Sequence, residues 1–185
     1  MVHYFNEEVN METAILLFIQ EYIRCDFLNP IVIFITHLGD AGIFWILLTV
    51  ILLLFKKTRP IAYIMTVSMV LSLLINNGIL KNTVMRIRPY DAIIGLNRII
   101  EAQKDYSFPS GHSACSFAAA IVILKTTDKK YGIPVVILAL FISLSRLYVG
   151  VHYPTDVLFG IVSGSIIACL SVFLFKKYNI IKNEE

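Results

Sequence analysis

The chain has 185 residues, of which 57% are hydrophobic and 16% charged, and its mean hydropathy is +0.75. This composition is too apolar for an ordinary soluble domain and indicates a polytopic membrane protein. The net charge is only +3, and the Lys and Arg residues lie between apolar runs rather than in one stripe, so we do not expect nucleic-acid binding.

The N-terminal segment, residues 1–37, has apolar residues at helical spacing but is interrupted by charges. These charges are Glu21, Arg24 and Asp26. A charge at the bilayer centre costs at least ~2.5 kcal/mol on insertion scales. We therefore expect residues 12–25 either to lie along the membrane interface or to pair their charges inside a bundle. The segment is accordingly an interfacial helix or a first membrane helix.

Five apolar runs follow, and each approaches the roughly 17–25 residues that a helix needs to cross a bilayer. They cover residues 41–55, 60–80, 111–124, 133–148 and 157–175. The sequence thus predicts an all-α membrane bundle of five to six transmembrane helices in a single domain, residues 1–185. Within the last run, Gly160-x3-Gly164 is a small-residue face that favours close helix packing within one chain.

Basic residues gather in three of the connections that alternation places on one side of the membrane. They are Lys56, Lys57 and Arg59, then Lys125, Lys129 and Lys130, and finally Lys176, Lys177 and Lys182. Short basic loops favour the cytoplasmic side. We therefore expect an integral protein of the plasma membrane whose loops 81–108 and 146–156 face outside.

Three polar clusters lie at that outer end of the spans. They read Lys81-x6-Arg88-Pro89, Pro109-Ser110-Gly111-His112 and Ser145-Arg146-x5-His152-x3-Asp156. Transfer of a phosphoryl group spreads negative charge over its oxygens, so it needs fixed donors that converge from several directions. Two guanidinium forks and an ammonium group suit that task, and a helix that begins at a Ser-Gly pair offers free N–H groups to an anion.

In residue types, spacing and order, the three clusters resemble the signature of the type 2 phosphatidic acid phosphatase (PAP2) family. The resemblance covers roughly residues 38–175. It implies a helical core of the acid phosphatase and haloperoxidase type, with a metal-independent phosphatase site at the membrane surface and no cofactor. The hydropathy argues against the soluble members of that family.

The resemblance also implies a role for each motif residue. His152 would be the nucleophile that forms a phosphohistidine, with Asp156 as the acceptor that orients its ring. His112 would protonate the leaving oxygen and then activate water. Phosphate would be bound by the remaining motif residues, Lys81, Arg88, Ser110, Gly111 and Arg146.

Polar residues outside the clusters are interpreted as structural. We expect Arg86, Arg98 and Lys104 to be interfacial cations, His37 to be an interfacial side chain and Asp40 to be a turn residue. The cysteines at positions 25, 115 and 169 are expected to pack as small residues, and no ligand spacing typical of a protein-bound metal is present.

A site at the depth of a lipid headgroup predicts a lipid phosphate or diphosphate as substrate, and the bilayer itself as partner. Among the family's substrates, undecaprenyl diphosphate is the favoured one. Phosphatidylglycerophosphate, phosphatidic acid and lipid A phosphates are the alternatives, because the motifs contact phosphate rather than lipid tail. A non-enzymatic lipid carrier or scaffold is a hypothesis of another class. The sequence leaves the oligomeric state open.

Overall fold

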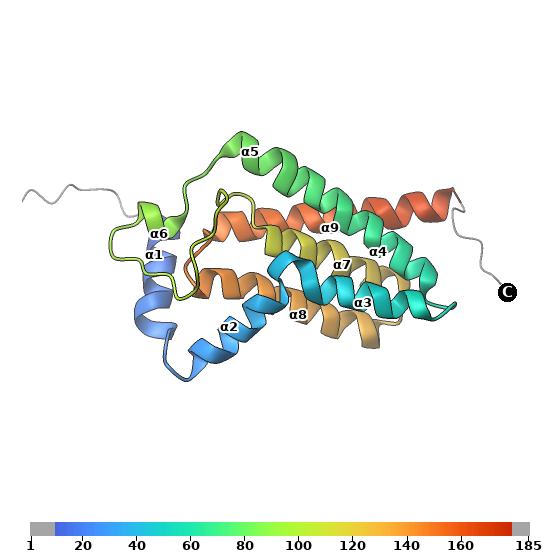
Figure 1. Cartoon of the computed structure of the whole chain (residues 1–185), viewed down its shortest axis with the longest axis horizontal. Helices are drawn as coiled ribbons and strands as arrows, with labels where there is room; N and C mark the ends of the chain where they lie inside the picture. Colours follow the sequence, from blue (N-terminus) through green and yellow to red (C-terminus); the bar gives the residue numbers. More distant parts are fainter. Residues whose placement is uncertain (1–9, 179–185) are drawn as a thin grey trace, which may run out of the picture.

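The computed structural model describes residues 10–178, and within this range the regular structure is helical (Figure 1). In chain order the elements are α1 (Met11–Phe18), the π-helical η1 (Ile19–Ile23), α2 (Leu28–Leu38), the short 3-10 turn η2 (Asp40–Gly42), α3 (Ile43–Leu54), α4 (Arg59–Ser72), the π-helical η3 (Leu73–Leu80), α5 (Lys81–Val84), α6 (Pro89–Ala92), α7 (Gly111–Thr126), α8 (Lys129–Tyr148) and α9 (Pro154–Lys177).

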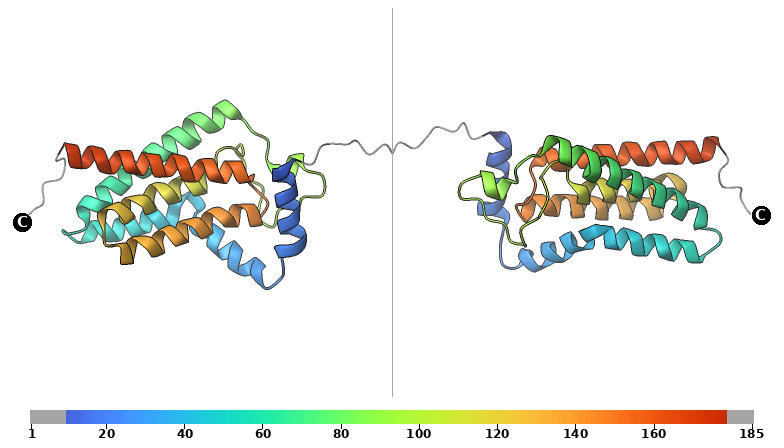
Figure 2. Two further views of the ribbon diagram at one scale, coloured as in Figure 1. Left: turned by 180° about the vertical axis from the view of Figure 1, so that it is seen from behind. Right: turned by 45° about the horizontal axis from the view of Figure 1, so that its top comes forward.

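Helix α7 lies at the centre of the bundle and packs against α4, α8 and α9 (Figures 1 and 2). Its middle turn consists of Ala118, Ala119 and Ala120, which are fully buried. Small side chains at these positions let three neighbouring helices approach one central helix. The main apolar core, which includes Trp45, Met65 and Ile142, forms around it.

The expected small-residue face of α9 packs against α7, as the sequence predicted. A Cβ atom on Gly160 would lie 2.7 Å from the backbone oxygen of Ser110, and one on Gly164 would overlap the backbone of Ala114. Because those neighbours are backbone atoms, they cannot move aside as a flexible side chain could. The two glycines therefore bring α9 close enough to align its first turn with the N-terminus of α7.

By length and composition, three helices in the described part of the chain could cross a membrane. They are Arg59–Ala92, α8 and α9. The bent pair α2 and Asp40–Leu54, with an angle of 49° between its halves, would be a fourth. Helix α7 is apolar but has 16 residues, or about 24 Å at the α-helical rise. The molecule is thus an integral, multi-pass membrane protein, while the finer count of five to six spans stays a prediction.

Helix α1 lies across one end of the bundle rather than along it (Figures 1 and 2). Its Leu16 is buried against Leu96 and Tyr153, while Met11 and Phe18 are exposed. Whether residues 12–25 lie at the membrane interface stays a prediction, while two of their charged side chains, Glu12 and Arg24, make contacts within the bundle.

The two ends of the bundle differ in their residues. The α3–α4 and α7–α8 connections and the end of α9, which hold the basic clusters, lie opposite α1 and the long connection 93–110 (Figure 1). Lys182, which belongs to the last cluster, lies outside the described residues. All three polar motifs are at the α1 end.

Candidate active site

A cavity of about 650 Å³ lies between α3 and α4 and extends to the α1 end of the bundle. Along the bundle its walls are mostly apolar and include Ile46, Val50, Leu53, Met69, Val70 and Leu73. At the α1 end its lining changes to polar residues, Lys81, Arg88, Asp105, Gly111, His112 and His152. Parts of all three sequence motifs therefore meet in one cavity.

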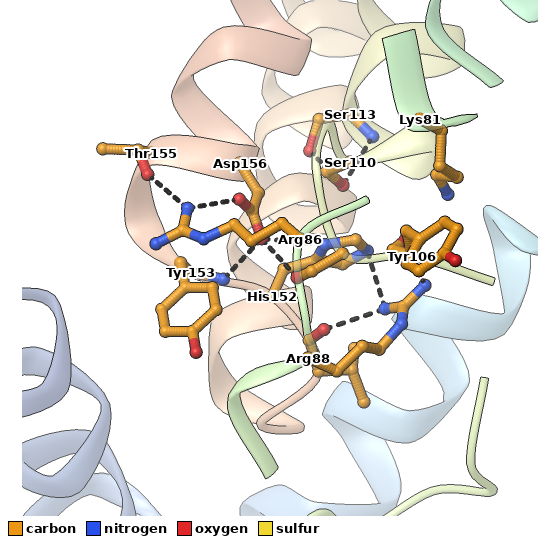
Figure 3. A network of polar contacts seen from close by, with 12 residues as sticks. Lys81, Arg86, Arg88, Tyr106, Ser110, Ser113, His152, Tyr153, Thr155 and Asp156 are labelled. Atoms are coloured by element: carbon orange, nitrogen blue, oxygen red, sulfur yellow. Dashed lines mark hydrogen bonds and ion pairs between the residues drawn. The ribbon is translucent and has the colours of Figure 1, made fainter. Parts of the chain in front are cut away.

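His152 lies on the loop between α8 and α9 and is 2% exposed. Its Nδ1 is 3.4 Å from Oδ2 of Asp156 in the first turn of α9 (Figure 3). The same oxygen accepts hydrogen bonds from the hydroxyl of Ser107 at 2.5 Å and from the backbone N–H of Tyr153 at 2.9 Å. These donors fix the carboxylate beside the imidazole, with one oxygen turned toward the ring.

The His152 imidazole is held in its neutral form. Burial lowers the pKa of His152 to about 3; the contact with Asp156 opposes this, and the positive charges of Arg88 and Arg146 add to it. A neutral ring has a free lone pair on one nitrogen, which is the state that a nucleophile requires.

Two of the three predicted phosphate-binding cations share one carboxylate, that of Asp105 in the connection 93–110. Lys81 Nζ is 2.6 Å from Asp105 Oδ2, and Arg88 Nη2 is 2.5 Å from Asp105 Oδ1. Burial raises the pKa of Asp105, but the bonds to both cations outweigh burial and the pKa is lowered overall. An ionised carboxylate thus sits where the sequence predicts a bound phosphate.

Arg88 also connects the cations to the imidazole. Its Nη1 donates to the backbone oxygen of Val151 at 2.8 Å and lies 3.3 Å from Nε2 of His152 (Figure 3). An anion held by Arg88 would therefore lie next to the ring nitrogen that Asp156 does not contact.

Arg146, near the end of α8, is the third cation; it is fully buried and, unlike Lys81 and Arg88, does not line the cavity. Its Nη1 donates to Thr36 at 2.6 Å, but Nε and Nη2 have no hydrogen-bond partner in residues 10–178. Buried donors are rarely left unpaired in folded proteins. Two free donors on one guanidinium group suit the oxygens of a phosphoryl group.

The second motif forms the N-terminus of α7. The Ser110 hydroxyl caps the helix by accepting from the backbone N–H of Ser113 at 3.4 Å and from its hydroxyl at 3.0 Å. Gly111 follows at the cavity wall, where the first N–H groups of the helix lack partners within it. Ser110 itself is buried behind the wall, so it shapes the site rather than lining it.

His112 has a carboxylate partner that the sequence did not reveal. Its Nε2 is 2.9 Å from Oδ1 of Asp40, whose Oδ2 is 2.6 Å from Nδ1 of His37. Asp40 does lie in a turn, as expected, but that turn is the bend between α2 and α3, and it places the carboxylate beside His112, which lines the cavity. The sequence signal was a Gly-Asp pair at a helix break, which is too common to indicate a site.

Arg86 is not the interfacial cation that the sequence predicted. Its Nη1 lies 2.6 Å from Oδ1 of Asp156 (Figure 3). Its Nη2 lies 2.5 Å from Oε2 of Glu12, and its guanidinium carbon lies 3.7 Å from the ring centre of Tyr153. Arg98, by contrast, is exposed and stacks on Tyr90 away from the cavity. Sequence alone did not separate these two arginines.

Comparison with known proteins shows the family to which the chain belongs. Residues 61–180 match the model of the PAP2 superfamily. The chain is 35% identical over 145 residues to an undecaprenyl-diphosphatase of Sulfolobus acidocaldarius, and the match covers 78% of this chain and 69% of that protein. It is 31% identical over 153 residues to the undecaprenyl-diphosphatase BcrC of Bacillus subtilis, with 82% and 75% covered.

The fold has a solved counterpart as well. The crystal structure of a transmembrane PAP2-type phosphatidylglycerolphosphate phosphatase from Bacillus subtilis matches with a TM-score of 0.72 and 25% identity, over 94% of this chain and 88% of that one. With most of the chain matched in sequence and in fold, and with the three motifs gathered at one cavity, the protein belongs to the PAP2 superfamily and is an integral-membrane lipid phosphatase.

Proposed function

We propose that the protein hydrolyses undecaprenyl diphosphate to undecaprenyl phosphate, without a metal ion, at the outer surface of the plasma membrane. The observation that carries this proposal is the cavity between α3 and α4, which joins a cationic end to a long apolar wall. A diphosphate fits the cationic end, and an isoprenoid chain can follow the apolar wall toward the lipid. The relatives named undecaprenyl-diphosphatase support the same substrate.

Binding begins with an exchange of anions. The terminal phosphoryl group of the substrate replaces the Asp105 carboxylate on Lys81 and Arg88. It also takes up the two unpaired donors of Arg146. Three cations then surround the phosphoryl oxygens from different directions, which stabilises the charge that develops during transfer.

The first chemical step uses the neutral ring of His152. With Nδ1–H donating to Asp156, the lone pair on Nε2 attacks phosphorus, a P–N bond forms and the P–O bond to the lipid phosphate breaks. A proton that His112 takes up together with the substrate phosphate passes to the leaving oxygen, and Asp40 holds the His112 ring.

The second step returns the enzyme to its starting state. Neutral His112 takes a proton from a water molecule, the water oxygen attacks phosphorus, and the P–N bond breaks to release inorganic phosphate. Each histidine thereby regains its original protonation state, so the cycle consumes one water molecule and no other reactant.

A phosphate-release assay on a lipid panel tests the proposal. The purified protein in vesicles is given undecaprenyl diphosphate, phosphatidylglycerophosphate, phosphatidic acid and a lipid A phosphate, each with and without EDTA. We expect the highest kcat/KM with the diphosphate, and equal rates with EDTA. A higher kcat/KM with a monophosphate would overturn the substrate, and no release from any lipid would favour a carrier or scaffold.

Phosphatidylglycerophosphate is the second candidate because of a further comparison. The chain is 31% identical over 170 residues, covering 85% of its length, to phosphatidylglycerophosphatase B of Bacillus subtilis. The two glycerol-linked tails of that lipid are shorter and bulkier than one isoprenoid chain. Comparison of the two lipids within the same panel therefore decides between these substrates.

A further inference from the structure

The catalytic carboxylate of Asp156 has two oxygens with different partners. Its Oδ2 faces His152 and accepts from Ser107 and the backbone of Tyr153. Among the hydrogen bonds of residues 10–178, the only one to its Oδ1 comes from Arg86 Nη1, at 2.6 Å. Asp156 is fully buried, so Arg86 supplies the positive charge that an otherwise uncompensated buried carboxylate requires.

Arg86 is itself held from the opposite side by helix α1. Glu12 Oε2 lies 2.5 Å from Arg86 Nη2, and Glu12 Oε1 accepts from the backbone N–H and hydroxyl of Thr155 at 3.0 and 2.6 Å. Thr155 lies in the first turn of α9, directly before Asp156. Glu12 therefore ties both the arginine and the turn that carries the catalytic carboxylate to α1.

The ring of Tyr153 further restricts the orientation of the Arg86 guanidinium group. The guanidinium carbon lies over this ring, 3.7 Å from the ring centre. A planar fork that stacks on an aromatic ring while it bridges two carboxylates has a defined orientation, and lysine cannot reproduce it. The plane of the Asp156 carboxylate, and with it the direction of Oδ2 toward His152, is thereby fixed.

We propose that Arg86 is a positioning residue for the nucleophile, acting through Asp156 (Figure 3), and that Glu12 on α1 holds Arg86 in place. This inference rests on the proposed phosphohistidine chemistry. It gives α1, which lies across the bundle end and exposes Met11 and Phe18, a direct connection to the catalytic centre. The position of α1 and the alignment of the imidazole are therefore linked.

Single-turnover kinetics on full-length protein in vesicles test the proposal, with Arg86→Gln, Arg86→Lys and Glu12→Gln beside the wild type. Loss of a hydrogen bond to a charged group predicts a roughly 10- to 100-fold slower first step for Arg86→Gln, a smaller loss for Arg86→Lys and a loss of about 3- to 10-fold for Glu12→Gln. Inhibition by inorganic phosphate should be unchanged, because Arg86 does not line the cationic end of the cavity.

Two controls separate positioning from a structural role. Arg98→Gln, which removes an exposed arginine of the connection 93–110, should turn over at the wild-type rate. The double variant Glu12→Gln with Arg86→Gln should be about as slow as Arg86→Gln alone, since residues in one network are not additive. A structural arginine would lower the fraction of active protein but leave the single-turnover rate of that fraction unchanged.

The outcomes also separate this inference from the function on which it rests. Wild-type rates in both single Gln variants, or phosphate inhibition weakened as much as the first step, would overturn the positioning role while phosphatase activity stands. If neither the wild type nor Arg98→Gln turned over substrate, the proposed function would be overturned, and the positioning role with it.

Discussion

At the scale of single residues, Asp105 occupies the position that we propose for the substrate phosphate. Its side chain is 49% exposed yet bonds both Lys81 and Arg88. If a site is free for only part of the time, the apparent affinity of its ligand falls by that fraction. Bound Asp105 therefore lowers the affinity of the site for phosphate.

We predict that Asp105→Asn binds inorganic phosphate and vanadate more tightly, by roughly 3- to 10-fold, because a neutral amide competes less for the two cations. Competitive inhibition constants measure this effect. Asp91→Asn, which changes an exposed carboxylate on α6, is the matched control. Weaker phosphate binding in Asp105→Asn would instead mean that the carboxylate holds the cations in place.

The buried neutral ring of His152 predicts a pH-dependent stability. Its pKa of about 3 in the folded protein lies below the ordinary value near 6.5 of an unfolded chain. Between these values the unfolded chain binds more protons than the folded protein does. The contribution of His152 to the free energy of unfolding therefore increases with pH and decreases as the pH falls. From pH 7 to pH 5 the loss is about 2 kcal/mol.

Thermal unfolding of wild type and His152→Asn at pH 7 and pH 5 measures this contribution. Between pH 7 and pH 5 the unfolding temperature of the wild type should fall further than that of the variant, because asparagine does not titrate. Equal losses in the two proteins would show that His152 is not kept neutral by the fold.

The sequence predicted that the motif residues lie together, which the structure confirms, but it did not predict their partners; the catalytic roles of these residues stay predictions. Lys81, Arg88, His112 and His152 were identifiable because a phosphoryl site needs those groups at motif spacing. Asp40 and Glu12 were not, since they act through neighbours 72 and 143 residues away in the chain. Pro89 favours extended backbone at Arg88, and in extended chain Arg86 and Arg88 share a face, but that weak signal needs the fold to interpret it.

At the scale of elements, apolar runs predicted most of the helices. The runs 111–124, 133–148 and 157–175 fall within α7, α8 and α9. The run 60–80 covers α4 and η3, but the change to π-helical geometry there has no hydropathy signal. Hydropathy also did not decide how α1 lies, because the answer depends on bonds from Glu12 to a helix at the other end of the chain.

The contact between α7 and α9 is the element-scale feature with the sharpest prediction. Gly164→Val should lower the free energy of unfolding by about 1–3 kcal/mol, the usual cost of overpacking, because its side chain would overlap the backbone of Ala114. Gly78→Ala is the control, since a Cβ there meets its nearest atom at 3.9 Å. Thermal unfolding in detergent measures both, and equal shifts would contradict the packing account.

At the scale of the whole molecule, the proposed orientation places the active site outside the cell. Ile94, 96% exposed in the connection 93–110, marks the site end, and Lys130 in α8 marks the opposite end. In a variant without its natural cysteines, a membrane-impermeant maleimide should label Ile94→Cys but not Lys130→Cys in intact cells. Both should react after permeabilisation. Labelling of Lys130→Cys alone would show the opposite orientation, with the active site facing the cytoplasm.

A covalent bond between the His152 imidazole and phosphorus can be measured directly. Wild type and His152→Ala are mixed with undecaprenyl diphosphate carrying ³²P in its terminal phosphoryl group, quenched during turnover and digested. We expect an acid-labile, base-stable label on the peptide that contains His152, and neither label nor turnover in His152→Ala. Full turnover by His152→Ala, or wild-type turnover with label on a different residue, would contradict it.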